Sequence, residues 1–247
     1  MNITGKHVVI SGGGTGVGAD MAHRFAAAGA RVTILGRTEE TLAAQGLPYV
    51  LCDVTDPEQV DAAFAQARAA RGPVAVAIAN AGAADSTPFA KMTAAGLEKM
   101  LAVNVTGVFT LWQAALEDMK SAGWGRMIAV ASTAGLKGYP YVAGYVAAKH
   151  GVVGLTRALA LELAQTGITV NALCPGFIET SMLDRSIANI VAKTGKTPEQ
   201  AARALNKGNP QGRFVQTHEV AGTALWLCSD DAGAVNGHAL SLSGGEI

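Results

Sequence analysis

The chain has 247 residues, of which 49% are hydrophobic and 15% charged, a composition that excludes an intrinsically disordered protein. Its 19 Lys and Arg balance 19 Asp and Glu, so there is no excess positive charge for binding nucleic acid. No apolar run is long enough to span a membrane, and we expect a cytoplasmic protein with neither a nucleic-acid nor a membrane partner.

Short β-branched runs alternate along the chain with longer segments of helical period. The expected strands are His7–Ser11, Arg31–Leu35, Pro48–Cys52, Val74–Ala79, Arg126–Ala131, Thr169–Leu173 and His238–Leu242. The expected helices are Gly16–Ala28, Pro57–Ala70, Ala94–Ser121, Val142–Gln165 and Thr217–Ser229. This alternation predicts an α/β fold with a seven-stranded, doubly wound parallel sheet and helices on both faces. Since no linker or repeat interrupts it, we expect one domain over residues 1–247.

A glycine cluster joins the first expected strand to the first expected helix. It reads Ser11-Gly12-Gly13-Gly14-Thr15-Gly16-Val17-Gly18. Glycines at such a junction allow a tight turn and a close approach of the backbone to a pyrophosphate, and the helix amino terminus offers free N–H groups to the anion. The strand before and the helix after favour a dinucleotide site over a loop without a ligand.

The end of the second strand bears on which dinucleotide is used. The acid that commonly binds the ribose hydroxyls of NAD is absent from Gly36-Arg37-Thr38. Arg37 is instead a planar cation suited to a 2′-phosphate. NADP(H) is therefore favoured over NAD(H); the alternative is that Arg37 is a solvated residue at a helix start and that both cofactors are accepted.

The sequence Tyr145-Val146-Ala147-Ala148-Lys149 places a phenol and an amine four residues apart, on one face of a helix. Ser132 closes the fifth expected strand, thirteen residues before Tyr145. A tyrosine ionises near pH 10, and lowering its pKa by about 2 to 3 units requires roughly 3 to 4 kcal/mol. We expect the nearby ammonium, together with a positive nicotinamide ring, to lower the pKa of Tyr145 in this way.

An insertion separates the sixth and seventh expected strands, with two short helices over residues 177–212. The second should begin at the capping box Thr197-Pro198-Glu199-Gln200. Apolar residues recur at helical spacing in the first: Met182, Leu183, Ile187, Ile190 and Val191. They either pack on the domain or form a lid over a substrate pocket.

Together these motifs resemble the short-chain dehydrogenase/reductase family over essentially the whole chain. The resemblance rests on Ser11–Gly18, Asp53, Asn80-Ala81-Gly82, Asn104, Ser132, Tyr145, Lys149 and Pro175-Gly176. It implies a Rossmann fold, a homotetramer, and an NAD(P)(H)-dependent enzyme that interconverts a secondary alcohol and a ketone. The remote alternative is a non-catalytic cofactor-sensing protein on the same fold.

The resemblance also implies roles for individual residues. Tyr145 would be the general acid and base, Lys149 would hold the nicotinamide ribose, Ser132 would bind the substrate oxygen, and Asn104 would support a water relay. The implied cofactor-binding positions are Ser11, Gly12, Gly14, Thr15, Gly16, Val17, Gly18, Arg37, Thr38, Asp53, Val54, Asn80, Ala81, Gly82, Tyr145, Lys149, Pro175, Gly176, Ile178 and Thr180. The histidines and cysteines show no ligand spacing, so no metal is expected.

The substrate is expected to be a small molecule or a thioester. A 3-hydroxyacyl/3-oxoacyl thioester of CoA or a carrier protein is the first choice, and a free cyclic, aryl or polyketide-type alcohol or ketone is the alternative. Either would occupy an apolar pocket built from Ala83, Ala84, Leu136, Tyr139, Tyr141, Phe177, Met182 and Ile187.

Overall fold

The apolar runs form seven strands of one parallel sheet, which the computed structural model describes for residues 3–247. The strands are β1 His7–Ser11, β2 Arg31–Gly36, β3 Tyr49–Leu51, β4 Val74–Ala79, β5 Gly125–Val130, β6 Ile168–Pro175 and β7 Ala239–Leu242. Their order across the sheet is β3-β2-β1-β4-β5-β6-β7. The predicted doubly wound sheet is confirmed, with strand ends displaced by only one or two residues from the predicted ones.

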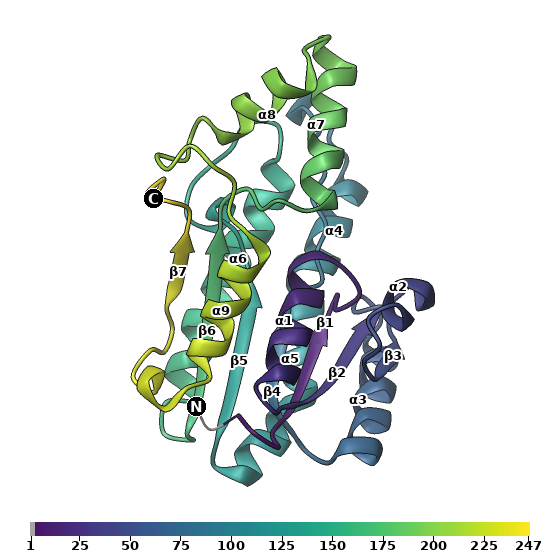
Figure 1. Cartoon of the computed structure of the whole chain (residues 1–247), viewed down its shortest axis with the longest axis vertical. Coiled ribbons are helices and arrows are strands. Elements are labelled where there is room, and N and C mark those ends of the chain that lie inside the picture. Colours follow the sequence, from purple (N-terminus) through teal and green to yellow (C-terminus); the bar gives the residue numbers. More distant parts are fainter. Residues whose placement is uncertain (1–2) are drawn as a thin grey trace.

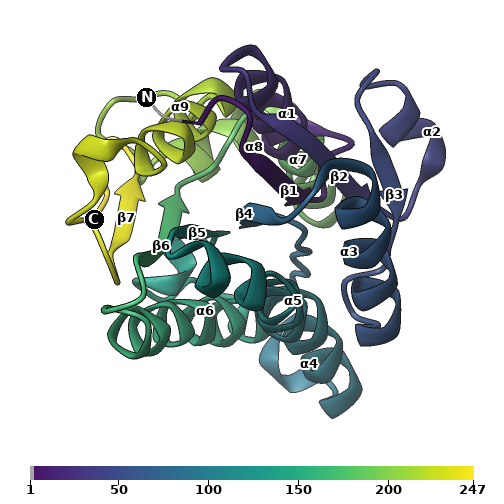
Figure 2. The same cartoon turned by 90° about the horizontal axis from the view of Figure 1, so that it is seen from below.

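Helices cover both faces of the sheet, as Figure 2 shows from one end. They are α1 Gly16–Ala27, α2 Glu39–Ala43, α3 Pro57–Arg71, α4 Ala94–Leu101, α5 Gly107–Ala122, α6 Ala143–Glu162, α7 Ser181–Thr194, α8 Pro198–Asn206 and α9 Thr217–Leu227. One apolar core packs α3, α5 and α6 against the sheet through residues such as Phe64, Trp112 and Val152. The other packs α1 and α9 through Phe25 and Val220. Because helices cover both faces, strands β1 and β6 are buried at every position.

The single helix predicted over Ala94–Ser121 is wrong, because a π-helical turn at Ala102–Thr106 separates α4 from α5. Two contacts accompany the interruption. Gly107 lies against the side chain of Val54, where a Cβ would come within 2.8 Å of Cγ2. The Asn104 amide is buried and donates to the carbonyl of Met100. A π-turn of this kind is frequent at functional sites, since it re-aims one side chain. The short helix α2 was also not predicted.

The insertion after β6 forms α7 and α8, which lie beyond the arrowheads of the strands (Figure 1). The predicted capping box is confirmed: the Thr197 hydroxyl accepts from the Gln200 N–H, and the Gln200 side chain accepts from the Thr197 N–H. In α7, Leu183 is buried and Met182 is exposed. These two helices therefore stand at the edge of the sheet where parallel strands place their ligands.

Strand order reverses beside β1, whose neighbours are β2 on one side and β4 on the other. Ligands of open α/β sheets bind outside the carboxyl ends of the strands at such a point. The glycine cluster follows β1, Asn80 follows β4 and Ser132 follows β5, so the topology delivers all three to one edge.

Candidate active site

The turn after β1 is locked to the end of β4. The Asn80 side chain donates from Nδ2 to the carbonyl oxygens of Ser11 and Gly12, each at 3.1 Å. The Ser11 hydroxyl accepts from the backbone N–H groups of Asn80 and Ala81, also at 3.1 Å. A Cβ at Gly18 would collide with the carbonyl oxygen of Gly12, so only glycine permits this packing. The structure thus brings these predicted cofactor-binding residues together.

The amino terminus of α1 fits a bound anion. The helix begins at Gly16, whose φ of +54° favours glycine, and the Thr15 side chain does not cap it. No acidic residue occupies its first turn, which leaves the first N–H groups and the positive end of the helix dipole for a phosphate. Thr180 lies beside this terminus, with its methyl group 3.4 Å from where a Cβ of Gly16 would be. The residues present therefore fit a dinucleotide pyrophosphate.

Arg37 forms an ion pair with Asp53, and this contact was not predicted from the sequence. Nη1 of Arg37 lies 3.6 Å from Oδ2 of Asp53, and the arginine side chain is 73% exposed. Burial raises the pKa of Asp53, but hydrogen bonds from the N–H and hydroxyl of Thr55 and the Arg37 charge outweigh it, leaving the pKa below its usual value. Both predicted residues thus lie at the carboxyl ends of β2 and β3, as one ion pair.

Lys149 is a buried cation with hydrogen-bonding capacity to spare. Its side chain is 4% exposed, and Nζ donates to the carbonyl oxygen of Val130 at 2.9 Å. Nζ lies 5.5 Å from the centre of the Tyr145 ring, one helical turn away. An ammonium has three donors, so two remain for acceptors such as ribose hydroxyls. The chemistry of this group fits the cofactor role that the sequence predicts.

The chain's own side chains do not lower the pKa of Tyr145, so the predicted lowering depends on the positive nicotinamide ring that the prediction includes. Burial raises the pKa of Tyr145 to about 12, and the Ser132 hydroxyl against the phenol opposes only part of that rise. Burial likewise lowers the pKa of Lys149 to about 8. Desolvation is the largest cause of both shifts, although Nζ of Lys149 lies only 5.5 Å from the ring centre of Tyr145. Any lowering of the phenol pKa must come from a further positive charge.

Asn104 lies near Lys149, and Ser132 lies near Tyr145. In the π-turn, Asn104 Nδ2 donates to the Ala83 carbonyl at 2.9 Å, and Oδ1 accepts from the Ala83 N–H at 3.4 Å. A Cβ at Gly82 would come 2.9 Å from Asn104 Oδ1 and 3.6 Å from Lys149 Nζ, so the three residues are neighbours. The Ser132 hydroxyl accepts from the Ala134 N–H at 3.1 Å and so caps the short turn after β5.

The remaining predicted cofactor residues lie at or near this edge. Pro175 ends β6, the Gly176 N–H donates to the Leu242 carbonyl, and Ile178 pairs with Val215 as an isolated bridge. The others fall in the glycine turn and at the ends of β2, β3 and β4: Gly14, Val17, Thr38, Val54 and Gly82.

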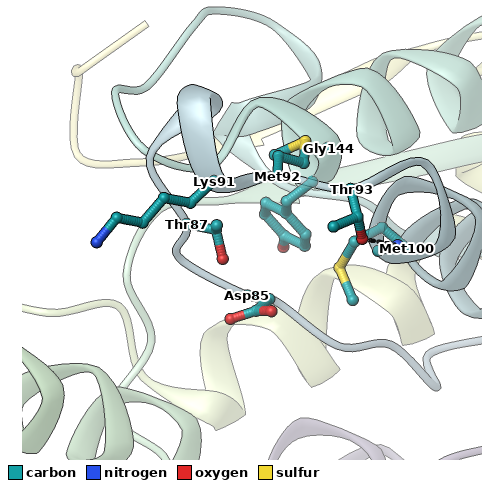
Figure 3. A pocket seen from close by; sticks show the side chains of 9 residues that line it. Asp85, Thr87, Lys91, Met92, Thr93, Met100 and Gly144 are labelled. Carbon is teal, nitrogen blue, oxygen red and sulfur yellow. Dashed lines mark hydrogen bonds between the residues drawn. The ribbon is translucent and has the colours of Figure 1, made fainter.

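A cavity of about 120 Å³ opens beside Tyr145 (Figure 3). Its other lining residues are Asp85, Thr87, Lys91, Met92, Thr93, Gly96, Met100 and Gly144. None of the eight residues of the apolar pocket predicted from sequence lines this cavity. The segment after β4 folds over the phenol instead and brings polar groups with it. Its position directly after Asn80-Ala81-Gly82 is the signal that could have found it.

Among residues 3–247, no group of three or more His, Cys, Asp or Glu is arranged to hold a metal ion. Within the same described residues, no helix has the length and apolarity needed to cross a membrane.

Comparison with known proteins gives a consistent set of relatives. The family model described as short chain dehydrogenase matches residues 6–190. The chain is 38% identical to a Streptomyces violaceoruber protein assigned as ketoacyl reductase 1 of the granaticin polyketide synthase, covering 96% of this chain and 91% of that one. It is 35% identical to the 3-oxoacyl-[acyl-carrier-protein] reductase MabA of Mycobacterium tuberculosis, covering 97% and 92%. A crystal structure of an actinorhodin polyketide ketoreductase with NADPH superposes with a TM-score of 0.93 at 35% identity, covering 98% and 97%.

Proposed function

The chain belongs to the short-chain dehydrogenase family and is a nicotinamide-dependent oxidoreductase of secondary alcohols and ketones, and on that premise we propose that it is an NADP(H)-preferring reductase of 3-oxoacyl thioesters. The substrate class and the cofactor preference are the proposed parts. We further propose the assignment of Ser132, Tyr145, Lys149 and Asn104 as its catalytic group, a cytoplasmic location and a homotetramer.

The geometry of the catalytic group supports a simple division of labour. When bound, the nicotinamide supplies the hydride for reduction or accepts it in oxidation. Tyr145 donates its phenolic proton to the substrate oxygen as that oxygen becomes an alkoxide, and takes the proton back in the reverse direction. The Ser132 hydroxyl, which lies against the phenol, donates a hydrogen bond to the same oxygen and orients it.

Lys149 contributes a fixed positive charge beneath the phenol. Its unused donors bind the ribose hydroxyls, and its charge together with that of an oxidised nicotinamide ring would favour proton release from Tyr145. Asn104, held by Ala83 and Met100, orders the polar groups beside Gly82 next to Nζ. The buried position of Lys149 excludes water from one side of the site, so these charges act in a medium that screens them weakly.

The substrate proposal rests on the character of the cavity. Met92 and Met100 offer apolar contacts near Tyr145, while Asp85, Thr87 and Lys91 form a polar wall that faces solvent. A 3-oxoacyl thioester suits this arrangement, because its ketone enters the cavity while its long polar carrier remains outside. The similarity to MabA, whose name describes a 3-oxoacyl reductase, supports the same class.

A free polyketide-type or aryl ketone is the second candidate. The similarity to the granaticin and actinorhodin ketoreductases favours it, since both are named for polyketides. The polar wall would then bind a second oxygen of the substrate, with Thr87 as donor and Asp85 as acceptor.

Consumption of NADPH and of NADH by the purified enzyme, with acetoacetyl-CoA and with 1-tetralone, tests these proposals. We expect kcat/KM for acetoacetyl-CoA to exceed that for 1-tetralone by about ten-fold or more. The reverse order would replace the thioester with the second candidate. Equal kcat/KM for NADPH and NADH, or a preference for NADH, would remove the NADP(H) proposal without affecting the substrate.

A further inference from the structure

In the segment after β7, the carboxylate of Glu246 lies beside the loop that follows Ser132. The side chain of Glu246 is 8% exposed, and its Oε1 accepts a hydrogen bond from the Tyr139 hydroxyl at 2.8 Å. The ammonium of Lys137 lies 2.7 Å from the same oxygen. A buried carboxylate is costly unless it is paired and hydrogen-bonded, and here both conditions are met.

The hydrogen bonds around Tyr139 have a definite direction. Its hydroxyl also lies 2.7 Å from Oγ1 of Thr133, where either oxygen could in principle donate. An ionised carboxylate has no proton to give, so the proton of Tyr139 goes to Glu246 and Thr133 must donate to Tyr139. The chain of donors therefore runs from Thr133 through Tyr139 to Glu246. It begins at the residue next to Ser132 in the turn after β5.

Glu246 also contacts the base of the insertion and the end of β6. A Cβ at Gly208, just after α8, would come 2.6 Å from Oε1, and one at Gly176 would come 3.5 Å from Oε2. Gly244 packs against the Asn209 side chain so closely that a Cβ there would collide with it. One carboxylate thus joins the Ser132 turn, the Pro175-Gly176 segment and the foot of the two-helix insertion.

We propose that Glu246 is a positioning residue for the reaction, which through the Tyr139 hydroxyl and Thr133 holds the turn of Ser132 in place beside Tyr145. The proposal rests on the catalytic assignment made above. A hydroxyl that must point at a reacting oxygen tolerates little displacement, because small errors in orientation lower the rate steeply. Burial raises the pKa of Tyr139, and the hydrogen bond to Glu246 adds to the rise, so this second phenol stays neutral beside Tyr145.

Four variants and one control test the proposal: Glu246→Ala, Glu246→Gln, Tyr139→Phe, the double variant Tyr139→Phe/Glu246→Ala, and Ile247→Ala. Ile247 is the matched control because it is the neighbouring residue of the same segment and is half exposed. The measurements are kcat and KM for whichever of acetoacetyl-CoA and 1-tetralone the wild-type enzyme reduces, the Kd for NADPH, and the melting temperature.

We expect Glu246→Ala to lower kcat by about ten-fold relative to Ile247→Ala while the Kd for NADPH changes by less than about two-fold. Glu246→Gln should lose less than about three-fold, because its amide oxygen still accepts from Tyr139. Since Tyr139 and Glu246 act through one hydrogen bond, the double variant should be no slower than Glu246→Ala. If Glu246→Ala does not fold, Tyr139→Phe against Ile247→Ala carries the test.

Either of two results would overturn the proposal. The first is a kcat of folded Glu246→Ala, or of Tyr139→Phe, that lies within about two-fold of the kcat of Ile247→Ala. The second is a double variant whose loss in kcat equals the product of the losses in the two single variants. Tyr145→Phe, assayed in parallel, separates this failure from a failure of the catalytic assignment. An inactive Tyr145→Phe beside a normal Glu246→Ala removes only the role of Glu246, whereas an active Tyr145→Phe removes the assignment on which that role rests.

Discussion

The two sides of Tyr145 differ in how firmly the chain holds them. On the cofactor side, Lys149 and Asn104 are buried and bonded to backbone carbonyls, and Asn80 locks the glycine turn. On the substrate side, the cavity residues Asp85, Lys91 and Thr93 are exposed. Tyr141 has a φ of 67°, unusual for a residue with a side chain, while its carbonyl accepts from the Thr87 N–H.

This difference corresponds to a division of roles between the reaction itself and the choice of substrate. Groups that hold a proton or a cofactor ribose must be placed within a few tenths of an ångström, so they stand at the ends of buried strands and on long helices. Residues that determine substrate specificity lie on exposed segments, whose sequence can vary without disturbing the core. Changes on the cofactor side should therefore act on kcat or on cofactor binding, and changes on the substrate side on KM.

The largest effect should come from Tyr145→Phe, which removes the proposed proton donor where the two sides meet. We expect kcat to fall by about 10³-fold or more in either direction of the reaction, because the general acid and base is lost and an aliphatic hydroxyl such as that of Ser132 is too weak an acid to replace a phenol. The Kd for NADPH, measured by fluorescence, should remain close to that of the wild type. Turnover near the wild-type rate would contradict the assignment.

Lys149→Met should lower kcat/KM by about 10²-fold and also weaken cofactor binding, because the buried charge serves both.

The same variant tests the pKa of Lys149 through the pH dependence of the free energy of unfolding. Burial lowers the pKa of Lys149 from 10.5 to about 8, so between these values the unfolded chain binds more protons than the folded one. The free energy of unfolding of the wild type should therefore rise with pH over this range relative to Lys149→Met.

Chemical denaturation of both proteins at intervals between pH 7.5 and pH 10 checks this sign. A difference that is flat or falls with pH would show that the ammonium is not desolvated in the folded protein. Above pH 10 the partly buried Tyr145 acts in the opposite direction. Its pKa is raised to about 12, so the unfolded chain releases that proton first and stability declines.

A smaller effect is expected from Arg37→Ala, which tests the exposed rim of the cofactor side. We expect kcat/KM with NADPH to fall by about ten-fold, since a charge-assisted contact to the 2′-phosphate is lost. The rate with NADH is the internal control and should hardly change. An equal loss with both cofactors would mean that Arg37 acts through its ion pair with Asp53 rather than on the phosphate.

The smallest effect should follow from Asp85→Asn on the polar wall of the cavity. The substitution keeps the size of the side chain and removes its charge, so we expect KM to change by about three-fold with kcat unaltered. A fall in kcat as large as that of Lys149→Met would contradict the division between the two sides.

Much of the cofactor side could be predicted because its signals are local. A strand, a glycine cluster and a helix in sequence specify a turn that packs only in one way, and Tyr145 and Lys149 share a helix face whatever surrounds them. The sheet followed from the periodicity of apolar residues, since parallel strands are buried on both faces. Even the capping box at Thr197 was visible, because it depends on residues three apart.

Other features depended on distances that the sequence does not contain. The π-turn at Ala102–Thr106 arises where Gly107 meets Val54, and the rise in the pKa of Tyr145 depends on how much water its neighbours remove. Whether polar or apolar residues would wall the cavity was decided by how the segment after β4 folds over the phenol.

By itself, therefore, the sequence determined the order of the elements, the glycine turn and the phenol–amine pair, all of which follow from residues close together in the chain. Only the tertiary structure decided the ion pair of Arg37 with Asp53, the cavity wall and the return of Glu246 to Tyr139, 107 residues away. The physical reason is that burial and long-range pairing set the energies of charged and hydrogen-bonding groups, and both depend on the packing of the whole sheet.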